Sequence, residues 1–232
     1  MVIGMERIRQ RKFDTVIFDL DGTLLDTLTD LTDSVNTVLA RYSLPQYSAE
    51  TIRGFVGNGI RRLMQLTIPE GEAHPQFEAI YNEFREYYNI HCMDCTEPYP
   101  GILLLLDELQ KDGYKLAIVS NKADSAVKIL RDIYFQDLIP VAIGESQDCK
   151  KKPAPDSVYR AMEELGADQA RTVYIGDSDV DLRTAENAGI PCILVSWGFR
   201  DREFLLAHGA VESQIASDVN RVREILYSDQ IF

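Results

Sequence analysis

A short apolar run that ends in two acidic residues constrains the fold of this chain most strongly. Residues 15–18 are apolar or β-branched and lead directly into Asp19; Asp21 and Gly22 follow two and three positions later. A continuous apolar run of this length predicts a strand buried on both faces, and the glycine ends it. Open α/β sheets place their ligand sites at the carboxyl ends of strands. We therefore expect a functional site here, against the simpler alternative of a strand that ends in a polar Asp-Gly turn.

The two acidic residues are close enough to repel each other. Such repulsion raises the pKa of one carboxyl group unless a cation lies between them. The spacing of Asp19 and Asp21 therefore predicts either a shared proton or a bound metal ion.

The pattern of the remaining chain predicts an α/β fold with a helical insertion. Apolar residues recur at helical spacing in segments near 28–42, 49–55, 60–66 and 75–88, and no strand-like run appears from 27 to 97. From residue 99 onward, helical segments alternate with apolar strands expected at 114–119, 139–143, 172–175 and 192–195, with an edge strand at 213–216. This alternation predicts right-handed βαβ units around a parallel sheet. We expect a core of residues 12–27 and 98–232, and a helical domain of residues 28–97.

Composition and charge exclude several classes of function. The chain has 232 residues and a net charge of −13, which argues against nucleic acid and against anionic membrane surfaces as partners. The apolar runs are too short to span a membrane. Residues 1–12 lack the apolar core of a signal peptide, so we expect a disordered or fraying lead-in and a cytoplasmic protein. We expect a monomer or a weak homodimer. The CxxC of Cys92 and Cys95 has no second ligand pair, so we do not expect a redox or metal role for it.

Polar residues follow several of the predicted strands. They are Asp19 and Asp21 after the first strand, Ser120 and Asn121 after the second, a lysine run at 150–152, and Asp177 with Asp181. Because the carboxyl ends of parallel strands meet at one edge of a sheet, we expect these groups to converge.

The convergent set suits phosphoryl transfer. Asp19 can act as a nucleophile, and Asp177 can hold a hard cation such as Mg²⁺ beside it. We expect free backbone N–H groups at Gly22 and Thr23, which suit phosphate oxygens, and Ser120 and a lysine could bind the same oxygens. Asp21 can then protonate the leaving oxygen and later deprotonate a water molecule.

Four segments of the chain resemble the motifs of the haloacid dehalogenase-like superfamily. They are Phe-Asp-Leu-Asp-Gly-Thr at 18–23, Ser-Asn at 120–121, Lys-Pro at 152–153 and Gly-Asp-Ser-Asp-Val-Asp at 176–181. The four motifs occur in the order of the family and span nearly the whole chain.

The resemblance implies a Rossmann-like core with an inserted helical cap and Mg²⁺-dependent hydrolysis through an aspartyl-phosphate on Asp19. It implies Asp21 as acid and base, and it implies Asp177 and the backbone carbonyl of Asp21 as metal ligands. Asp181 would orient the metal shell or Lys152, or bind the metal. The dehalogenase branch of the family lacks the second aspartate, so Asp21 favours phosphate chemistry. The proline after Lys152 favours this lysine over its two neighbours.

The segment 55–60 in the expected cap resembles the cap loop of phosphoglycolate phosphatases. Its glycines allow the backbone to approach a ligand, and we expect Asn58, Arg53 and Arg61 to contact the substrate. The alternative is a helix–helix turn with solvated arginines. Together with Gly22 and Asn121, these residues form the expected substrate site.

We therefore expect a Mg²⁺-dependent phosphatase that acts on a small, phosphoglycolate-like phosphorylated metabolite. A β-phosphoglucomutase-like phosphotransferase and an inorganic pyrophosphatase are the alternative enzymes. A phospho-accepting switch domain is the non-enzymatic alternative, although a cap would hide the aspartate that such a domain must expose.

Overall fold

The computed structural model describes residues 12–228, and the expected N-terminal lead-in lies almost entirely outside this range. The core is a six-stranded sheet in the order β5-β4-β1-β6-β7-β8, and every neighbouring pair is parallel. The strands are β1 (Thr15–Phe18), β4 (Lys115–Ala123), β5 (Val141–Glu145), β6 (Thr172–Gly176), β7 (Cys192–Val195) and β8 (Ile215–Ala216). The predicted α/β class is confirmed.

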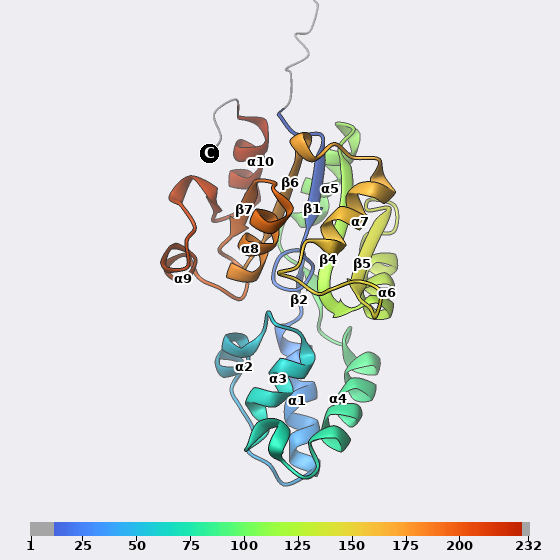
Figure 1. Cartoon of the computed structure of the whole chain (residues 1–232), viewed down its shortest axis with the longest axis vertical. Helices are drawn as coiled ribbons and strands as arrows, with labels where there is room; N and C mark the ends of the chain where they lie inside the picture. Colours follow the sequence, from blue (N-terminus) through green and yellow to red (C-terminus); the bar gives the residue numbers. More distant parts are fainter. Residues whose placement is uncertain (1–11, 229–232) are drawn as a thin grey trace, which may run out of the picture.

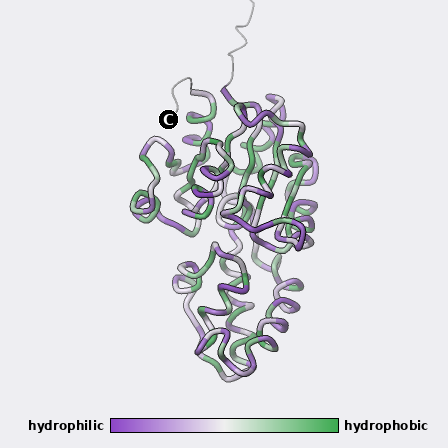
Figure 2. The backbone as a smooth tube through the Cα atoms, in the orientation of Figure 1, coloured by the Kyte–Doolittle hydropathy of each residue, from purple (hydrophilic) through white to green (hydrophobic). Residues whose placement is uncertain are grey.

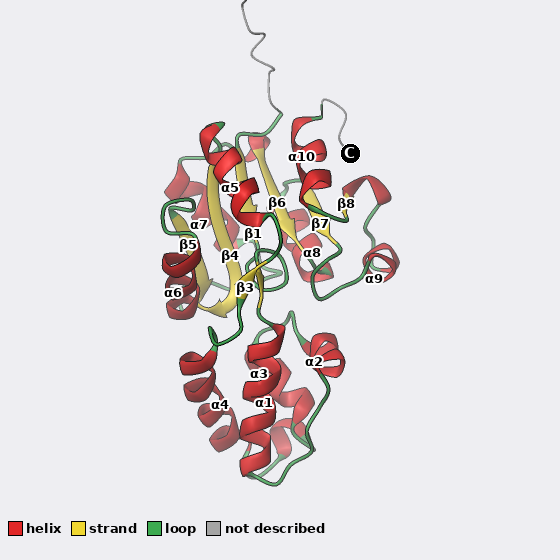
Figure 3. Cartoon of the chain, turned by 180° about the vertical axis from the view of Figure 1, so that it is seen from behind, coloured by secondary structure: helices red, strands yellow, loops and turns green. Residues whose placement is uncertain are grey.

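Helices cover both faces of this sheet (Figures 1 and 3). One face packs against α5 (Ile102–Lys111), α6 (Asp124–Tyr134) and α10 (Val219–Tyr227), and the other against α7 (Asp156–Leu165) and α8 (Asp179–Ala188), with α9 (Arg202–Ala207) at the edge. Two separate apolar clusters result, one on each side of the sheet. Figure 2 shows the hydrophobic stretches running along the strands and polar segments in the loops.

The central strand is apolar because both of its faces are covered. All four residues of β1 are buried, and β1 pairs with β4 on one side and β6 on the other. The first strand therefore sits in the middle of the sheet, as its continuous apolar run predicts. Its end, at Asp19, is flanked by the ends of β4 and β6.

Four helices form a separate group below the sheet in Figure 1. They are α1 (Leu28–Arg41), α2 (Ala49–Phe55), α3 (Ile60–Thr67) and α4 (Phe77–His91). Their inner faces share a third apolar cluster, which includes Val35, Ile52, Met64 and Phe84. Because this group buries its own core, it packs as a unit distinct from the sheet.

The two chain crossings between the helical group and the sheet are paired with each other. β2 (Leu25–Asp26) and β3 (Glu97–Pro98) form a two-stranded antiparallel ladder. At the start of α1, the N-cap residue Thr27 makes no capping hydrogen bond with its side chain, and Asp26 Oδ1 accepts from the backbone N–H of Leu28.

No helix within residues 12–228 is both long enough and apolar enough to cross a lipid bilayer.

Candidate active site

Three adjacent strands deliver the predicted polar residues to one edge of the sheet. Asp19 follows β1, Ser120 lies near the end of β4, and Asp177 follows β6. Because β4, β1 and β6 are neighbours, residues more than 150 positions apart in the sequence become neighbours in space. The expected convergence at the carboxyl edge is present.

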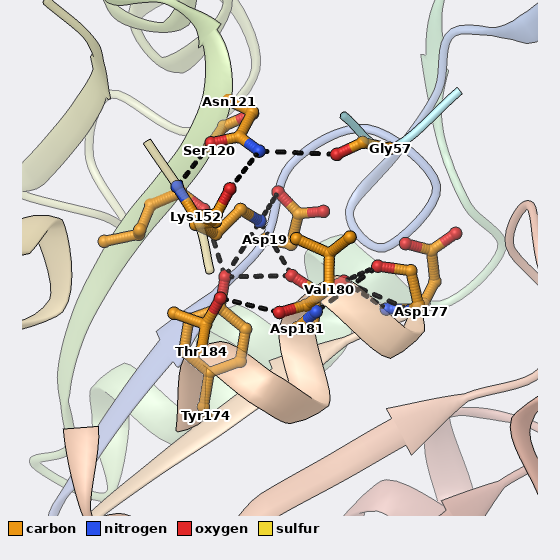
Figure 4. Close-up of polar contacts among 12 residues, drawn as sticks. Asp19, Gly57, Ser120, Asn121, Lys152, Tyr174, Asp177, Val180, Asp181 and Thr184 are labelled. Atoms are coloured by element: carbon orange, nitrogen blue, oxygen red, sulfur yellow. Dashed lines mark hydrogen bonds and ion pairs between the residues drawn. The ribbon is translucent and has the colours of Figure 1, made fainter. Parts of the chain in front are cut away.

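Lys152 is the central cation of the site (Figure 4). Its ammonium lies 2.9 Å from Asp19 Oδ1 and 2.7 Å from Asp181 Oδ1, and it is 3.0 Å from the hydroxyl of Tyr174. Burial alone would lower the pKa of Lys152, but Asp181 and Asp19 outweigh burial and raise this pKa well above its ordinary value. Lys152, of the three lysines in the run, is thus the one at the site and stays charged there.

Asp181 is fully buried and uses both of its oxygens within the protein. Oδ1 binds Lys152, while Oδ2 accepts from the backbone N–H and the hydroxyl of Ser178, at 3.1 and 2.6 Å. Ser178 is the N-cap of α8, and the two residues form a capping box. Both oxygens of Asp181 are therefore engaged within the protein, and Asp181 fixes the position of Lys152 while it also belongs to the acidic cluster described next.

Asp19 and Asp177 are the pair that fits a divalent cation. Asp19, Asp177 and Asp181 each place a carboxylate oxygen within 4.8 Å of the other two. Asp19 Oδ1 is buried and lacks a hydrogen bond of good geometry, even though Lys152 is close. Oxygen donors held together in this way match the preference of Mg²⁺ for carboxylates. The residues present therefore fit the ion that the sequence predicts.

The electrostatics of the pair also favour a cation. Burial raises the pKa of Asp19 to about 7, against the opposing effect of Lys152. Burial likewise raises the pKa of Asp177 well above its ordinary value, with further contributions from Asp181 and Asp19. A positive ion between the two carboxylates would relieve this repulsion.

The loop after Asp19 differs from the prediction in one respect. The backbone N–H groups of Gly22 and Thr23, expected to be free for phosphate, donate to Leu25 O and Leu20 O at 2.9 and 3.3 Å. The tight turn uses these donors itself. The Thr23 hydroxyl is buried and has no hydrogen-bond partner within residues 12–228.

Gly22 lies in close contact with the carboxylate of Asp177. Its φ is +87°, and a Cβ added there would lie only 2.4 Å from Asp177 Oδ2. The position therefore requires glycine both for its backbone conformation and for the close approach of Asp177.

Asn121 joins three segments of the site. Its side-chain oxygen accepts from the backbone N–H of Lys152 at 2.7 Å, and its amide nitrogen donates to Lys152 O and Gly57 O at 3.1 and 3.3 Å. The Ser120 hydroxyl accepts from the backbone N–H of Lys122 at 3.2 Å. Both residues line the cavity, and Asn121 also fixes the loop that carries Lys152.

The helical group covers the site at the carboxyl edge of the sheet. A cavity of about 60 Å³ lies between the two parts. Its floor includes Asp19, Asp21, Lys152 and Asp177, and its roof is largely apolar, formed by Leu31, Val56, Ile60 and Leu63 with Tyr88. The site is thus a small cavity with a charged end and an apolar end.

The cap residues predicted to contact substrate lie outside the cavity lining. Arg61 donates to Glu72 and Glu78 on the cap surface, and Arg53 donates to the carbonyls of Gly198 and Phe199. Asn58 offers its backbone carbonyl to Lys151 at 3.3 Å. Gly57 and Gly59, by contrast, do reach the cavity, as expected of the loop. The structure therefore brings the cap loop to the site but not these three side chains.

Three residues of the site were missed by the sequence analysis. Lys122 binds Asp21 Oδ1 at 2.9 Å, Tyr88 lines the cavity from α4, and Arg200 lines it from the loop after β7. The position of Lys122, directly after Ser120 and Asn121 at a strand end, was a usable signal. Nothing in the local pattern distinguishes Tyr88 or Arg200 from neighbouring aromatic and charged residues.

Comparison with known proteins agrees with this geometry. Residues 16–195 match the family model of the haloacid dehalogenase-like hydrolases. A phosphoglycolate phosphatase from Aquifex aeolicus is 33% identical over 79% of this chain and 85% of its own length. An N-acetylmuramic acid 6-phosphate phosphatase from Pseudomonas aeruginosa is 29% identical over 87% of this chain and 89% of its own length.

A solved structure extends the likeness to three dimensions. It is a provisionally assigned phosphoglycolate phosphatase from Lactobacillus delbrueckii subsp. bulgaricus, 34% identical, with a TM-score of 0.88 over 93% of this chain and 98% of the other. The chain belongs to the haloacid dehalogenase-like hydrolases, in the branch similar to phosphoglycolate phosphatases.

Proposed function

We propose that the protein is a Mg²⁺-dependent phosphatase that hydrolyses a small phosphorylated metabolite through an aspartyl-phosphate on Asp19. One observation carries this proposal: Asp19 and Asp177 bring carboxylate oxygens within 4.8 Å of each other, beside the buried ammonium of Lys152. A nucleophile, a cation site and a fixed positive charge then meet at one end of the cavity.

Each side chain has a distinct task in the proposed reaction. Asp19 attacks phosphorus, while Lys152 compensates the charge of the phosphoryl oxygens. Asp21 gives a proton to the leaving oxygen and then takes one from the water that hydrolyses the aspartyl-phosphate. Ser120 lines the cavity beside these groups and can donate to a phosphoryl oxygen.

Asp19 and Asp177 would hold Mg²⁺, together with the backbone carbonyl of Asp21. When bound, the ion supplies positive charge that offsets the repulsion between the carboxylates and an anionic phosphate. Asp181, with both oxygens engaged, would act on the site through Lys152.

A small substrate suits the volume and the chemistry of the cavity. About 60 Å³ is available in the closed state, and Arg200 and Lys122 are the basic residues, besides Lys152, that line it among residues 12–228. A short phosphorylated acid, as in the name of the Aquifex relative, fits these features. The Pseudomonas relative, named for a sugar phosphate, makes a larger substrate the second candidate.

We further propose that residues 28–97 act as the cap over a core of residues 12–27 and 98–232. The composition-based expectations of a cytoplasmic location and of a monomer or weak homodimer stay predictions.

A panel of phosphorylated metabolites, ranked by kcat/KM with and without Mg²⁺, tests the proposal. We expect phosphate release that depends on Mg²⁺, and an acid-stable ³²P label on wild-type protein but not on Asp19→Asn. Asp179→Asn is the matched control, because Asp179 lies in the same motif but pairs with Arg183 on α8. Hydrolysis that survives Asp19→Asn would overturn the nucleophile assignment.

The same panel separates the alternatives. Conversion of a sugar phosphate to its isomer without phosphate release would indicate the phosphotransferase, and activity restricted to pyrophosphate would indicate the pyrophosphatase. A single stoichiometric phosphorylation without turnover would indicate a switch domain.

A further inference from the structure

Lys122 is a buried cation to which the proposed phosphoryl-transfer and proton-transfer steps give no task. It lies near the end of β4, and its side chain is 5% exposed. Its ammonium is 2.9 Å from Asp21 Oδ1 and 2.6 Å from the hydroxyl of Tyr88. A buried lysine persists only where its charge is compensated, so these two contacts account for its position.

The two partners of Lys122 come from different parts of the molecule. Asp21 belongs to the loop after β1 in the core, whereas Tyr88 is a residue of α4 in the helical cap. The ring of Tyr88 also packs on the ammonium, 4.5 Å from the ring centroid, and stacks on Phe84. Tyr88 is therefore anchored in the cap core, and its contact with Lys122 exists only while the cap rests on the sheet.

We propose that Lys122 is a positioning residue for Asp21, and that Tyr88 makes this positioning depend on cap closure. Lys122 holds Oδ1, so that the second oxygen of Asp21 is the one left to exchange a proton at the reacting phosphate. The inference rests on the proposed phosphatase function and assigns to the cap a part in the acid–base step, beyond covering the substrate.

The proton transfer supplies the means of testing this inference. When the bond from phosphorus to the leaving oxygen breaks, its electron pair stays on that oxygen, which takes the proton of Asp21. An alkoxide leaving group needs this proton. 2,4-Dinitrophenolate is stable as an anion and does not need it.

The experiment compares kcat/KM for the best alkyl phosphate of the panel with kcat/KM for 2,4-dinitrophenyl phosphate. This parameter reports the steps up to leaving-group departure. For Lys122→Met we expect a loss of about 100-fold or more on the alkyl phosphate, as for a displaced general acid, and only a few-fold loss on the aryl phosphate. For Tyr88→Phe we expect the same pattern with smaller factors: kcat/KM should fall more on the alkyl phosphate than on the aryl phosphate.

A double variant distinguishes positioning from direct action on the substrate. If Lys122 acts through Asp21, Lys122→Met combined with Asp21→Asn should be no worse than Asp21→Asn alone, to within about 3-fold. Multiplied losses would show an independent role and overturn the proposal. Equal losses on both substrates, no loss, or a gain would overturn it as well.

Two controls keep the outcomes separate. Tyr87→Phe removes the hydroxyl of the preceding residue, which stacks on His91 away from the cavity, and should leave both substrates unchanged. Thermal unfolding and Mg²⁺ titration of each variant identify damage to the fold. If the wild-type protein hydrolyses neither substrate, the proposed function fails; if it hydrolyses both without the expected difference, only the role of Lys122 fails.

Discussion

Arg53 of the cap and Arg200 of the core reach across the junction in opposite directions. The Arg53 guanidinium donates to Gly198 O and Phe199 O at 2.7 and 2.9 Å. The Arg200 guanidinium donates to Arg53 O and Val56 O, both at 2.7 Å. Each arginine thus binds the backbone beside the other, and together they hold the loop after α2 against the loop after β7.

This reciprocal contact also reaches the proposed metal ligands. The backbone N–H of Phe199 donates to Asp177 Oδ2 at 2.6 Å, and Phe199 O is one of the acceptors of Arg53. Phe199, whose carbonyl accepts from Arg53, therefore orients the carboxylate of Asp177 through its backbone N–H.

We predict that Arg200→Met lowers kcat/KM by about 10-fold or more, because hydrogen bonds from a charged donor contribute about 1.5–3 kcal/mol to the closed arrangement. The melting temperature should change little by comparison with kcat/KM, since cap and core keep separate apolar clusters. Arg202→Met is the control, because Arg202 pairs with Glu212 on the surface. Equal kcat/KM for Arg200→Met and wild type would contradict the role of this contact.

Arg61→Met should change kcat/KM less than about 2-fold for both an anionic metabolite and an aryl phosphate. Arg61 binds Glu72 and Glu78, and its guanidinium lies 5.1 Å from the ring of Tyr81, outside the cavity lining. Steady-state kinetics on the two substrates check the prediction. A selective loss on the anionic metabolite would restore the sequence-based expectation that Arg61 contacts the substrate.

Gly22→Ala should abolish most activity as well as lower stability. The substitution forces a non-glycine residue to φ +87° and places a Cβ 2.4 Å from Asp177 Oδ2. The strained backbone alone costs about 1–3 kcal/mol. The steric conflict should in addition displace Asp177 and weaken Mg²⁺ binding, which a titration can measure.

Gly113→Ala isolates the strain from the steric conflict. Gly113 also has a positive φ, +77°, but an added Cβ there would meet no atom within 4 Å. This variant should lose stability to a comparable degree and keep its kcat/KM. Equal loss of activity in both variants would mean that the approach of Gly22 to Asp177 is unimportant.

The stabilisation by Mg²⁺ should increase with pH. Because burial raises the pKa of Asp19 to about 7, the folded metal-free protein binds this proton more tightly than the unfolded chain does. The stability that the proton contributes is fully present below the unfolded pKa, near 4, and is lost as the pH rises through about 7. Mg²⁺ needs the ionised carboxylate, so its affinity should rise about 10-fold from pH 6 to pH 8 for one displaced proton.

The shift in Tm on addition of MgCl₂, measured at both pH values against NaCl of equal ionic strength, checks this prediction. We expect the larger shift at pH 8, and a weaker pH dependence in Asp19→Asn. The same shift at pH 6 and pH 8 would contradict the competition between proton and metal at Asp19.

The core of the site could be predicted because strand ends determine it. Apolar runs located β1, β4 and β6, and the residues that follow them, such as Asp19 and Asp177, meet by the geometry of a parallel sheet. Lys152, which the following proline favours over its two neighbours, lies beside Asp19. In each case a local pattern fixed a position at the same sheet edge.

The cap side of the site could not be predicted in the same way. Periodicity assigns a residue to the apolar face of a helix, but it does not show that the tip of that residue reaches another domain, as Tyr88 does. Arg53 and Arg61 look equivalent in the sequence, yet one binds core carbonyls and the other binds surface glutamates. The difference depends on the docking of two separately packed units, which no local pattern records.

The pairing of β2 with β3 limits how the cap can move. Leu25 and Asp26 face Pro98 and Glu97 in one antiparallel ladder, so the two polypeptide connections are tied to each other and should move together. A movement of the helical group away from the sheet would separate Tyr88 from Lys122 and Arg53 from Gly198. Substrate entry, release of Asp177 and release of Asp21 should accordingly be one cooperative event, with no intermediate in which the site is open to solvent but still assembled.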